Sequence, residues 1–575
     1  MSTTLFDSSN PARAIAITGS GGSGAVTTGQ IMLAAVARAG FYGLMTRSAG
    51  PQIRGGESAA MLRYAAQPVA CMGDVFDILV GLDWKNIDRF IDEIPLSPDS
   101  FILTDPDTGP APDSLHPAGA KILEIPFKKY TEPVEGGRIN MAAIGATGAI
   151  AGLPLDALEA AVGDVLGRKG EAVVASSLAC VRAAWTDTQA MLCVTPPTGT
   201  APERWNISGN EASGLGAMRG GVRLVAAYPI TPASEILEWL APRLNKVGGV
   251  LLQAEDELAS VNMIIGASFG GVPSLTATSG PGLSLMAEGL GLAVASETPV
   301  VVANVMRGGP STGIPTRSEQ SDLNLALYGF HGDAPHLVLA ALDIRDCAFT
   351  TQWAVRLAEH LQTVAIVLTD QSLGQSRGVV DPPDSYNGDH RRIRAETPGD
   401  AYQRYAITAD GVSPMAIPGT PDGMYTGDGL EHTPAGIPSS LHHDHTQQSE
   451  KRLRKLQYFD YGEHWAVQSG NGPVCLLTWG SASGAVFEAA ERLTAAGSPT
   501  RVVALRLLAP LRVEALREAL ADAETLLVVE QNQGGQCFYY LKSHDVLPAH
   551  TRFFGRPGPL ALRPGEIITA LDEVK

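Results

Sequence analysis

The chain has 575 residues, 45% hydrophobic and 18% charged, which is typical of a folded globular protein rather than a disordered one. Its formal net charge of −18 disfavours nucleic acid and anionic membranes as main partners. The six cysteines are widely spread and none forms a Cys-x-x-Cys pair, so we expect no zinc site or iron–sulfur cluster built by this chain alone.

The same length predicts three or four domains, at about 150 residues each. No apolar run reaches the roughly 18 residues of a membrane helix, and residues 1–10 lack the pattern of a signal peptide. Isolated cysteines are typical of a reducing compartment. We therefore expect a cytoplasmic protein that does not enter the membrane.

A glycine-rich loop lies between a predicted strand, residues 13–17, and a predicted helix, residues 30–39. This order points backbone N–H groups and a helix N-terminus at a bound phosphate. The pattern G-x-G-x-x-G is present, and the loop glycines are Gly19, Gly21, Gly22 and Gly24.

Recognition of NAD would require an acidic residue about 20 positions further on. No Asp or Glu occurs between Gly24 and Glu57, and Arg47 and Arg54 lie there instead. The sequence therefore favours a phosphate-rich ligand other than NAD. A tight turn with a purely structural role is the alternative.

Alternating strands and helices continue to the Pro- and Thr-rich segment 195–202, which we interpret as a linker. The predicted strands are residues 76–80 and 100–104, and the predicted helices are residues 86–91, 141–151 and 155–165.

The stretch from Tyr228 to Asp322 contains a rigid turn, Tyr228-Pro229-Ile230-Thr231-Pro232, between a predicted strand at 222–227 and a helix that opens at Ser234. A further helix is predicted at 209–219. The two prolines fix the backbone on both sides of Thr231 and so preset the direction of its hydroxyl. A simple strand–turn–helix connection is the alternative.

Two charged positions in this stretch are candidates for binding a ligand. Glu255-Asp256-Glu257 opens an apolar helix. Acidic side chains there are either stabilised by the helix dipole or bind a protonated heterocycle. Arg307 follows an apolar run, residues 299–305, and its planar guanidinium suits a carboxylate.

From about residue 382 to 450 the periodicity fades. The histidines at 442, 443 and 445 are predicted to lie in a polar loop rather than to bind a metal, and residues 449–456 to form a solvated basic helix face. A small parallel α/β unit follows, with strands at 474–479, 500–505 and 524–530 and helices at 483–496 and 513–520.

Several strings together resemble the α subunit of 2-oxoacid:ferredoxin oxidoreductases with a γ domain fused at the N-terminus. The resemblance covers essentially the whole chain. The strings are Thr18–Gly24, Arg54-Gly55-Gly56, Gly209-Asn210-Glu211-Ala212, Tyr228–Pro232, Thr278–Gly282, Arg307–Asp322, Gly411–Pro414, Pro418-Gly419, Lys451-Arg452 and Glu530-Gln531-Asn532.

This resemblance implies a multidomain α/β fold. The expected parts are a γ-type glycine-loop domain at 1–200, a thiamine-diphosphate pyrimidine-binding-type domain at 201–380, an irregular connecting segment at 381–465 and a transketolase C-terminal-like domain at 466–575.

The resemblance also implies site residues. Thr231 and Arg307 would contact the 2-oxoacid, with Tyr228 beside them, and Glu257 would bind the aminopyrimidine of thiamine diphosphate, with Glu255 as the second choice. The glycine loop, Arg47 and Arg54 would lie near coenzyme A.

A partner is expected because half of the usual cofactor site is absent. Gly427-Asp428-Gly429 is not preceded by a predicted strand, and no Asn-Asn pair occurs. We therefore expect an obligate β subunit that carries the diphosphate site, Mg²⁺ and a [4Fe–4S] cluster, in an (αβ)2 heterotetramer that reduces ferredoxin. No metal ligands are assigned to this chain.

The expected reaction converts 2-oxoglutarate, coenzyme A and oxidised ferredoxin to succinyl-CoA, CO2 and reduced ferredoxin, and in reverse would fix CO2 in a reductive tricarboxylic acid cycle. A pyruvate or branched-chain 2-oxoacid enzyme, a thiamine-dependent enzyme without redox chemistry, and a non-catalytic CoA- or nucleotide-binding assembly protein are the alternatives.

Overall fold

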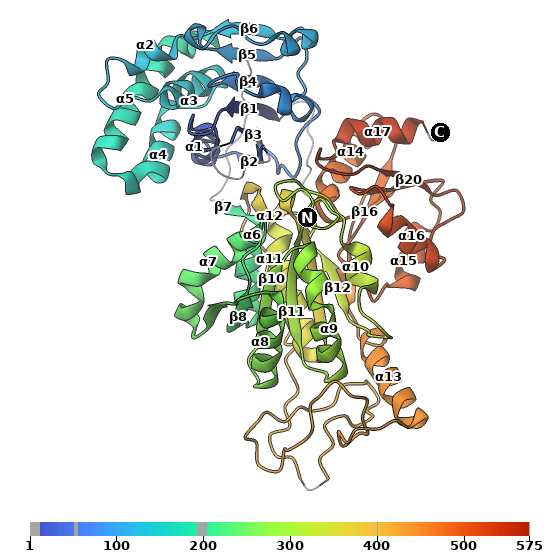
Figure 1. Ribbon diagram of the computed structural model, residues 1–575. Helices are drawn as coiled ribbons and strands as arrows, with labels where there is room; N and C mark the ends of the chain where they lie inside the picture. The colour runs from blue at the N-terminus through green and yellow to red at the C-terminus, as the bar shows by residue number, and fades with distance from the viewer. Residues whose placement is uncertain (1–11, 51–55, 193–203, 400, 574–575) are drawn as a thin grey trace.

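The computed structural model describes residues 12–50, 56–192, 204–399 and 401–573, except the side chains at 116 and 117. Three α/β units pack against one another (Figure 1). An irregular segment extends from the end of the central unit that is farthest from the N-terminal unit. Arg54 and the predicted linker at 195–202 lie outside the described residues. No described helix is both long and apolar enough to cross a membrane.

The N-terminal unit is built on an eight-stranded sheet of order β6-β5-β4-β1-β3-β2-β14-β7. Its central strand, β1, is buried along almost its whole length and pairs in parallel with β4 and antiparallel with β3. The strands from this part of the chain are β1 Arg13–Gly19, β2 Tyr42–Ala49, β3 Ser58–Ala65, β4 Ile78–Gly81, β5 Phe101–Thr104 and β6 Lys121–Glu124.

Helices α1, α3, α4 and α5 pack together beside this sheet around an apolar core. The helices are α1 Ala25–Arg38, α2 Phe127–Thr131, α3 Ile139–Ile150, α4 Leu155–Leu166 and α5 Glu171–Thr188. The predicted strands and most predicted helices are confirmed. The helix predicted at 86–91 is instead two 3-10 turns, Ile87–Arg89 and Ile91–Glu93.

Two strands that follow the N-terminal unit in sequence complete its sheet. β14 (Arg377–Val380) pairs antiparallel with both β2 and β7 (Trp205–Ser208). The sequence analysis predicted neither strand. The N-terminal and central units are therefore joined by main-chain hydrogen bonds.

The central unit has a seven-stranded sheet of order β18-β12-β13-β11-β10-β8-β9, parallel except for β18. Its own strands are β8 Leu224–Ala227, β9 Val250–Gln253, β10 Ser274–Thr278, β11 Val300–Met306, β12 Leu337–Ala340 and β13 Val364–Asp370. Its helices are α6 Gly209–Gly220, α7 Ser234–Leu244, α8 Glu257–Phe269, α9 Gly280–Ala295, α10 Leu323–Tyr328, α11 Ile344–Leu361 and α12 Gln371–Gln375.

Helices α6 and α11 approach each other closely because α6 is rich in glycine. A Cβ atom on Gly216 would lie 2.2 Å from the carbonyl oxygen of Ala348 in α11. A Cβ atom on Gly209 would lie 2.2 Å from the carbonyl oxygen of Leu373 in α12. The small residues predicted to form this helix therefore set the contact between helices.

The segment from 381 to 441 has no helix and only isolated bridges among its described residues, whereas the irregular segment was predicted to extend to 465. It ends at α13 (His442–Gln457), so the three histidines lie in the first turn of a helix rather than in a loop. The solvated basic face predicted at 449–456 is wrong, because Lys451, Arg452 and Lys455 are buried.

A buried carboxylate explains this difference. Glu297, which follows α9, accepts from Lys451 at 2.6 Å and from Lys455 at 2.9 Å, and its backbone oxygen accepts from Arg404 at 2.8 Å. The two lysines hold the pKa of Glu297 well below its ordinary value against the effect of burial. These contacts fasten α13 and the irregular segment to the central unit.

The C-terminal unit is a five-stranded sheet of order β15-β17-β16-β19-β20, and its predicted strands and helices are confirmed. The elements are β15 Ala466–Ser469, β16 Val474–Trp479, α14 Ser483–Ala495, β17 Thr500–Leu505, α15 Val513–Leu520, β19 Thr525–Glu530, α16 Gln536–Ser543, β20 Arg552–Gly555 and α17 Pro564–Asp572. A further strand, β18 (Leu507–Ala509), leaves this unit and pairs with β12 of the central sheet.

Candidate functional site

The turn that contains Thr231 is held from two sides. Asn210 Nδ2, in α6, donates to the backbone oxygen of Pro232 at 3.0 Å. Arg307 Nη1 donates to the backbone oxygen of Thr231 at 2.6 Å. Tyr228, at the start of the turn, is exposed. The structure thus brings Thr231 and Arg307, 76 residues apart in sequence, into direct contact.

Arg307 directly follows β11 and is 7% exposed. Burial lowers the pKa of its guanidinium, and the charge of Asp322 opposes that effect. The Nε atom of Arg307 has no hydrogen-bond partner among the described residues. The guanidinium therefore keeps an unused donor inside the protein.

Asp322 acts electrostatically on Arg307 and is itself held by two donors. Its Oδ2 accepts from Asn304 Nδ2 at 2.9 Å, and its Oδ1 accepts from Ser321 Oγ at 3.2 Å. Ser321 Oγ is also 2.9 Å from the backbone oxygen of Arg307. Burial raises the pKa of Asp322, while these donors and Arg307 lower it.

Of the two acids considered for the cofactor, Glu257 is buried and Glu255 is exposed. Asp256 caps α8, accepting from the backbone N–H of Ala259 at 2.7 Å. Glu257 lies against the first turn of α9, because a Cβ atom on Gly282 would be 2.8 Å from its Oε1.

Asp322 lies against the same turn of α9, since a Cβ atom on Gly280 would be 2.7 Å from its Oδ1. The glycines of the string Ser279-Gly280-Pro281-Gly282 thus let two carboxylates approach one helix N-terminus, where the helix dipole favours negative charge. Glu257 and Asp322 are brought together in this way.

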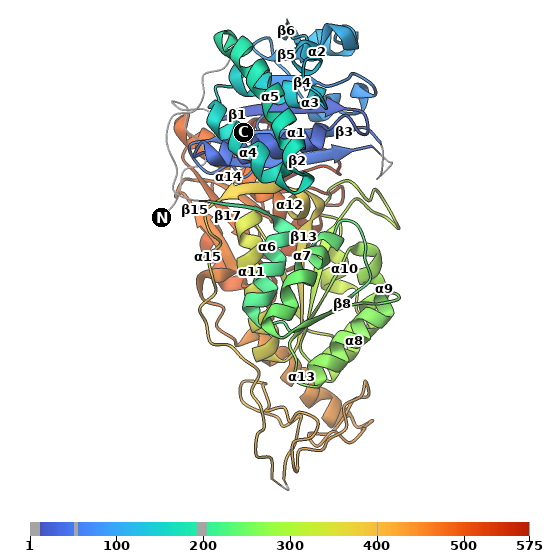
Figure 2. The ribbon, with the colours of Figure 1, turned by 90° about the vertical axis from the view of Figure 1, so that its left-hand side faces the viewer.

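The glycine loop faces a cavity of about 690 Å³ between the N-terminal and central units. Gly21, Gly22 and Gly24 line it, as do Thr231 and Pro232 on the opposite side. Gly24 has φ of 90° and precedes the first residue of α1. Figure 2 shows the N-terminal unit lying over α12 and the upper end of the central unit. The cavity therefore joins the predicted phosphate loop to the predicted substrate turn.

Gly19 and Arg47 differ in their relation to this cavity. Gly19 ends β1 beneath the loop, where a Cβ atom would lie 2.3 Å from Ser23 Oγ, and it does not line the cavity. Arg47 does line it, but its guanidinium is paired with Glu235 at the start of α7. Gln375 Nε2 donates to the same Glu235 oxygen at 3.1 Å.

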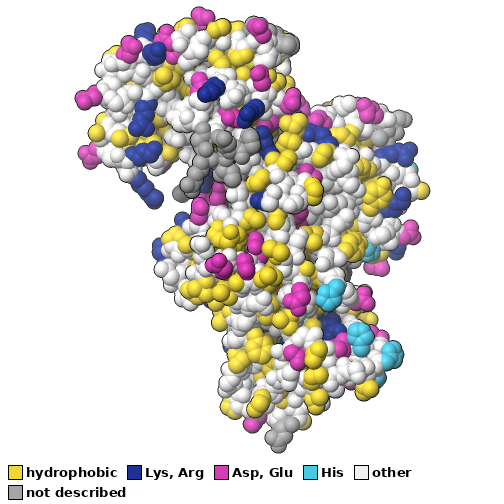
Figure 3. Space-filling model, viewed as in Figure 1, with side chains coloured by type: hydrophobic (Ala, Val, Ile, Leu, Met, Phe, Trp, Pro, Cys, Tyr) yellow, Lys and Arg dark blue, Asp and Glu magenta, His cyan; other side chains and the backbone are white. Residues whose placement is uncertain are grey.

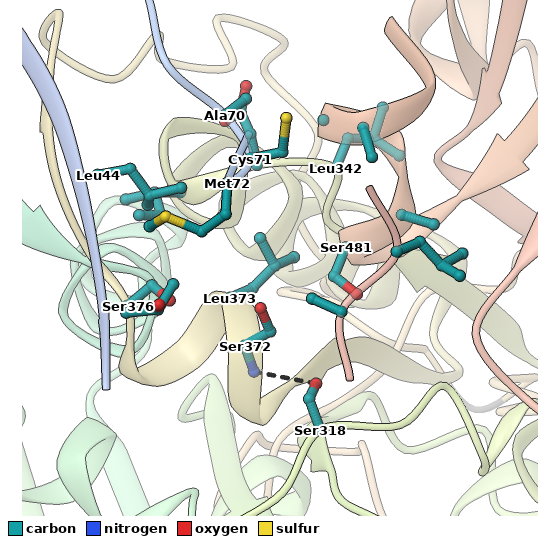
Figure 4. A pocket seen from close by; sticks show the side chains of 18 of the residues that line it. Leu44, Ala70, Cys71, Met72, Ser318, Leu342, Ser372, Leu373, Ser376 and Ser481 are labelled. Atoms are coloured by element: carbon teal, nitrogen blue, oxygen red, sulfur yellow. Dashed lines mark hydrogen bonds between the residues drawn. The ribbon is translucent and has the colours of Figure 1, made fainter. Parts of the chain in front are cut away.

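A second cavity, of about 620 Å³, lies where all three units meet (Figure 4). Leu44, Cys71 and Met72 from the N-terminal unit line one side, and Ser481 from the C-terminal unit lines another. Between them, the backbone N–H of Ser372 donates to Ser318 Oγ at 3.1 Å. Four residues line both cavities: Arg47, Thr316, Gln371 and Gln375.

The sequence analysis did not assign a role to Asp322, Asn304 or Glu235. Asp322 and Asn210 occur inside strings that carry the family resemblance, so those strings were the available signal. Nothing comparable marked Asn304 or Glu235, because their partners are distant in sequence.

Comparison with protein-family models matches three parts of the chain in order. Residues 14–186 match the model described as pyruvate ferredoxin/flavodoxin oxidoreductase. Residues 215–451 match the thiamine-diphosphate-binding model of pyruvate flavodoxin/ferredoxin oxidoreductase, and residues 463–535 match the transketolase C-terminal domain.

Individual relatives agree with these matches. The α subunit of a 2-oxoacid:ferredoxin oxidoreductase from Saccharolobus solfataricus is 37% identical over 380 residues, which are 62% of this chain and 60% of the relative. The 2-oxoglutarate synthase subunit KorA of Archaeoglobus fulgidus is 37% identical over 57% of this chain and 88% of its own length.

A solved structure extends the likeness to nearly the whole chain. The 2-oxoglutarate:ferredoxin oxidoreductase of Magnetococcus marinus is similar with a TM-score of 0.89 and 34% identity, over 98% of this chain and 99% of that one. The chain belongs to the 2-oxoacid:ferredoxin oxidoreductase family. The predicted resemblance to an α subunit with a fused γ domain and the predicted α/β fold class are confirmed.

The match to one of these relatives covers only part of that relative. The chain spans about 60% of the length of the Saccharolobus solfataricus 2-oxoacid:ferredoxin oxidoreductase subunit. The three family-model matches follow one another along this chain, with the glycine-loop unit first, the thiamine-diphosphate-binding unit second and the transketolase-like unit last.

Proposed function

We propose that this chain, together with a β subunit, oxidatively decarboxylates a 2-oxoacid, transfers the acyl group to coenzyme A and passes electrons to ferredoxin. The observation that carries this proposal is the cavity that joins the glycine loop to Thr231, whose carbonyl binds the buried Arg307. Forming a thioester requires the coenzyme A thiol and the 2-oxoacid carbon to meet at one place.

Within this proposal Arg307 binds the 2-oxoacid carboxylate, and Thr231 and Tyr228 orient the substrate. The low exposure of Arg307 supports its role, because a charge–charge contact is stronger where water is excluded. We also propose that the chain is divided functionally as the sequence predicts. The glycine-loop domain is residues 1–200, the pyrimidine-binding-type domain 201–380, the connecting segment 381–465 and the transketolase C-terminal-like domain 466–575.

Thiamine diphosphate fits the surroundings of Glu257. A buried carboxylate beside a glycine turn can accept from a ring nitrogen of the aminopyrimidine. When bound, the cofactor supplies the electron sink for decarboxylation. Glu257 would hold the proton at that ring nitrogen, and the exposed Glu255 would not.

Coenzyme A fits the glycine-loop side of the larger cavity, where backbone N–H groups at the start of α1 can bind phosphate. Arg138 and Lys169 line the same cavity and add positive charge. Arg47 and Arg54 remain proposed contacts. Arg47 would stay near the ligand while paired with Glu235.

The β subunit would carry the diphosphate site, Mg²⁺ and the [4Fe–4S] cluster, in an (αβ)2 heterotetramer. The five cysteines that the structure describes are free thiols, Cys71, Cys180, Cys347, Cys475 and Cys537. Hydrophobic side chains gather over the region of α8 and α9 (Figure 3), where Leu258, Met263 and Leu285 are 43–51% exposed. An exposed apolar face beside Glu257 suits a permanent partner.

We further propose 2-oxoglutarate as the substrate and a cytoplasmic location, with CO2 fixation through a reductive tricarboxylic acid cycle as the reverse direction. Relatives named 2-oxoglutarate synthase support this substrate, as does the Magnetococcus marinus structure, which holds 2-oxoglutarate, coenzyme A and succinyl-CoA.

The test is viologen reduction by the complex of this chain with its β subunit, supplied with coenzyme A and either 2-oxoglutarate, pyruvate or a branched-chain 2-oxoacid. We expect activity that needs both chains and coenzyme A and is highest with 2-oxoglutarate. Substantial reduction by this chain alone would overturn the shared site. Preference for another acid would overturn the substrate, and CO2 release without electron transfer would overturn the redox chemistry.

A further inference from the structure

The C-terminal unit makes an unusual set of contacts with residues 320–324, the segment that carries Asp322 behind Arg307. Gln320 is fully buried. Its Nε2 donates to the backbone oxygen of Trp479 at 2.7 Å, and its Oε1 accepts from the backbone N–H of Gln531 at 2.6 Å. One neutral side chain thus spans two strand ends, those of β16 and β19.

The main chain of Gln320 is bound by the same unit. Its N–H donates to the backbone oxygen of Gln531 at 2.9 Å, and its carbonyl accepts from Asn532 Nδ2 at 3.1 Å. Gly480 makes this approach possible, because a Cβ atom there would lie 2.5 Å from Gln320 Nε2.

Gln536, the first residue of α16, extends the contact toward the substrate arginine. Its Nε2 donates to the backbone oxygen of Ser321 at 2.8 Å, and its Oε1 accepts from the N–H of Asn324 at 2.9 Å. The residue between Gln320 and Asp322, Ser321, reaches the backbone oxygen of Arg307. A continuous path of hydrogen bonds therefore joins α16 to Arg307.

The C-terminal loop that makes these contacts is itself fixed. Glu530 is fully buried and accepts from the N–H groups of Cys537 and Phe538 at 2.9 and 3.0 Å, and from Asn532 Nδ2 at 2.7 Å. This carboxylate ties the end of β19 to the first turn of α16. Gln536 therefore lies at the start of a helix whose first turn is bound to the end of β19.

We infer that Gln536 and Gln320 are positioning residues for the 2-oxoacid site, acting through Ser321 and Asp322 on the direction of the Arg307 guanidinium. The inference rests on the proposed function, and it assigns a role to the side chains of Gln320 and Gln536, which have no other role in the site. A side-chain amide can donate and accept at once without adding charge to residues 320–324.

The chain offers a matched control at the same loop. The side chain of Gln531 donates only to the backbone oxygen of Leu560, within the C-terminal unit, at 2.8 Å. Gln531→Ala and Gln536→Ala each remove one side-chain amide, at two positions of the same loop region. Only the second breaks the path to Arg307.

In the complex with the β subunit, we expect Gln536→Ala to raise the KM for the 2-oxoacid about tenfold or more. The KM for coenzyme A and the melting temperature should stay near those of the wild type. Gln531→Ala should change neither KM more than about twofold. A substitution with a merely structural effect would shift both KM values together, so equal shifts, or an unchanged 2-oxoacid KM, would overturn the inference.

Hydrogen–deuterium exchange of the same complexes tests the positioning without any activity. Gln536→Ala should speed exchange in peptides covering 320–328, where the Asn324 N–H loses its acceptor, and Gln531→Ala should not. If the wild-type complex turns over no 2-oxoacid, the proposed function fails, while unchanged exchange in Gln536→Ala would overturn the positioning role separately.

Discussion

Arg307 and Arg47 differ in how their positive charges are compensated. Arg307 is buried beside Asp322 and keeps an unpartnered Nε, among the residues described, while Arg47 is half-exposed and paired with Glu235. A buried cation with spare donors attracts an anion more strongly than a solvated, paired one. Substitution at Arg307 should therefore affect the 2-oxoacid specifically.

We expect Arg307→Ala to lower kcat/KM for the 2-oxoacid by a factor of about 10² or more, because a buried carboxylate contact is lost. The KM for coenzyme A should not change. Steady-state viologen reduction by the complex measures both constants. Arg243→Ala is the control, since the exposed Arg243 contacts only Trp239 in the interactions described, through its backbone oxygen and its ring on the surface of α7; similar losses in both variants would contradict the assignment.

Glu257 and Glu255 form a second matched pair at the residue scale. We expect Glu257→Gln to reduce turnover by a factor of about 10² or more, since proton transfer by a placed carboxylate contributes about that much. Glu255→Gln should retain nearly full activity because Glu255 is exposed. Initial rates at saturating thiamine diphosphate distinguish the two, and the reverse ranking would exchange their roles.

At the scale of elements, α13 holds the irregular segment through buried and half-buried carboxylates. The Glu297 carboxylate accepts from Lys451 and Lys455, so its removal leaves these two buried cations without their acidic partner. Burial lowers the pKa of Lys451 to about 8, although Glu297 raises it. The segment thus depends on one acidic side chain from a different element.

Glu297→Gln should reduce the free energy of unfolding by about 3–5 kcal/mol, the usual effect of breaking a buried ion pair on one side. Urea denaturation of the purified chain measures it. Asp389→Asn provides the control, because the pair of Asp389 and Arg391 is 80% and 74% exposed and should contribute less than about 1 kcal/mol. Equal effects would show that Glu297 is not the fastening point.

Acid should loosen the same region. Glu431 accepts from Arg452 and His445, and these partners lower its pKa from 4.5 to about 2 against the effect of burial. A carboxylate with a lowered pKa contributes stability that is complete above pH 4.5 and is lost as the pH falls from about 4.5 to 2.

We therefore expect wild-type stability to fall more steeply across this pH window than that of Glu431→Gln, by roughly 1–2 kcal/mol after solvent screening. Thermal unfolding at intervals between pH 5 and pH 2 tests the difference. Parallel curves for the two proteins would exclude Glu431 as a contributor.

Across the whole molecule, the N-terminal and C-terminal units are joined by a buried ion pair. Arg63 in β3 donates to both oxygens of Glu488 in α14, at 2.6 and 2.8 Å, and the two side chains are 7% and 3% exposed. Arg492 also contacts Glu488 and Asp74. The glycine loop is therefore positioned over the central unit partly by the C-terminal one.

Glu488→Gln should destabilise this junction by about 3–5 kcal/mol, because Arg63 is left buried without a full charge partner. Differential scanning calorimetry should then show the unfolding peak moving to lower temperature or dividing in two. Glu159→Gln, at a pair with the half-exposed Arg182 inside the N-terminal unit, should leave the profile within the effect of a surface pair. An unchanged profile for Glu488→Gln would show that the junction does not depend on this pair.

Local patterns in the sequence determined most elements and the order of the units. The buried strands β1 and β16 contain the apolar runs 14–17 and 474–477, and α8 begins where an acidic cluster meets an apolar run. Such signals involve neighbours in the chain, and strand and helix periodicities express them directly. The strings at 228–232 and 307–322 likewise marked the candidate site before any contact was known.

Only the tertiary structure decided which distant residues meet. The strands at 205–208, 377–380 and 507–509 join sheets of other units, and Lys451 and Lys455 are buried although their local sequence is that of a solvated helix. Gln536 reaches Ser321 across 215 positions of the chain. Hydrogen bonds and ion pairs of this kind depend on packing between elements, which leaves no periodicity in the sequence that could predict it.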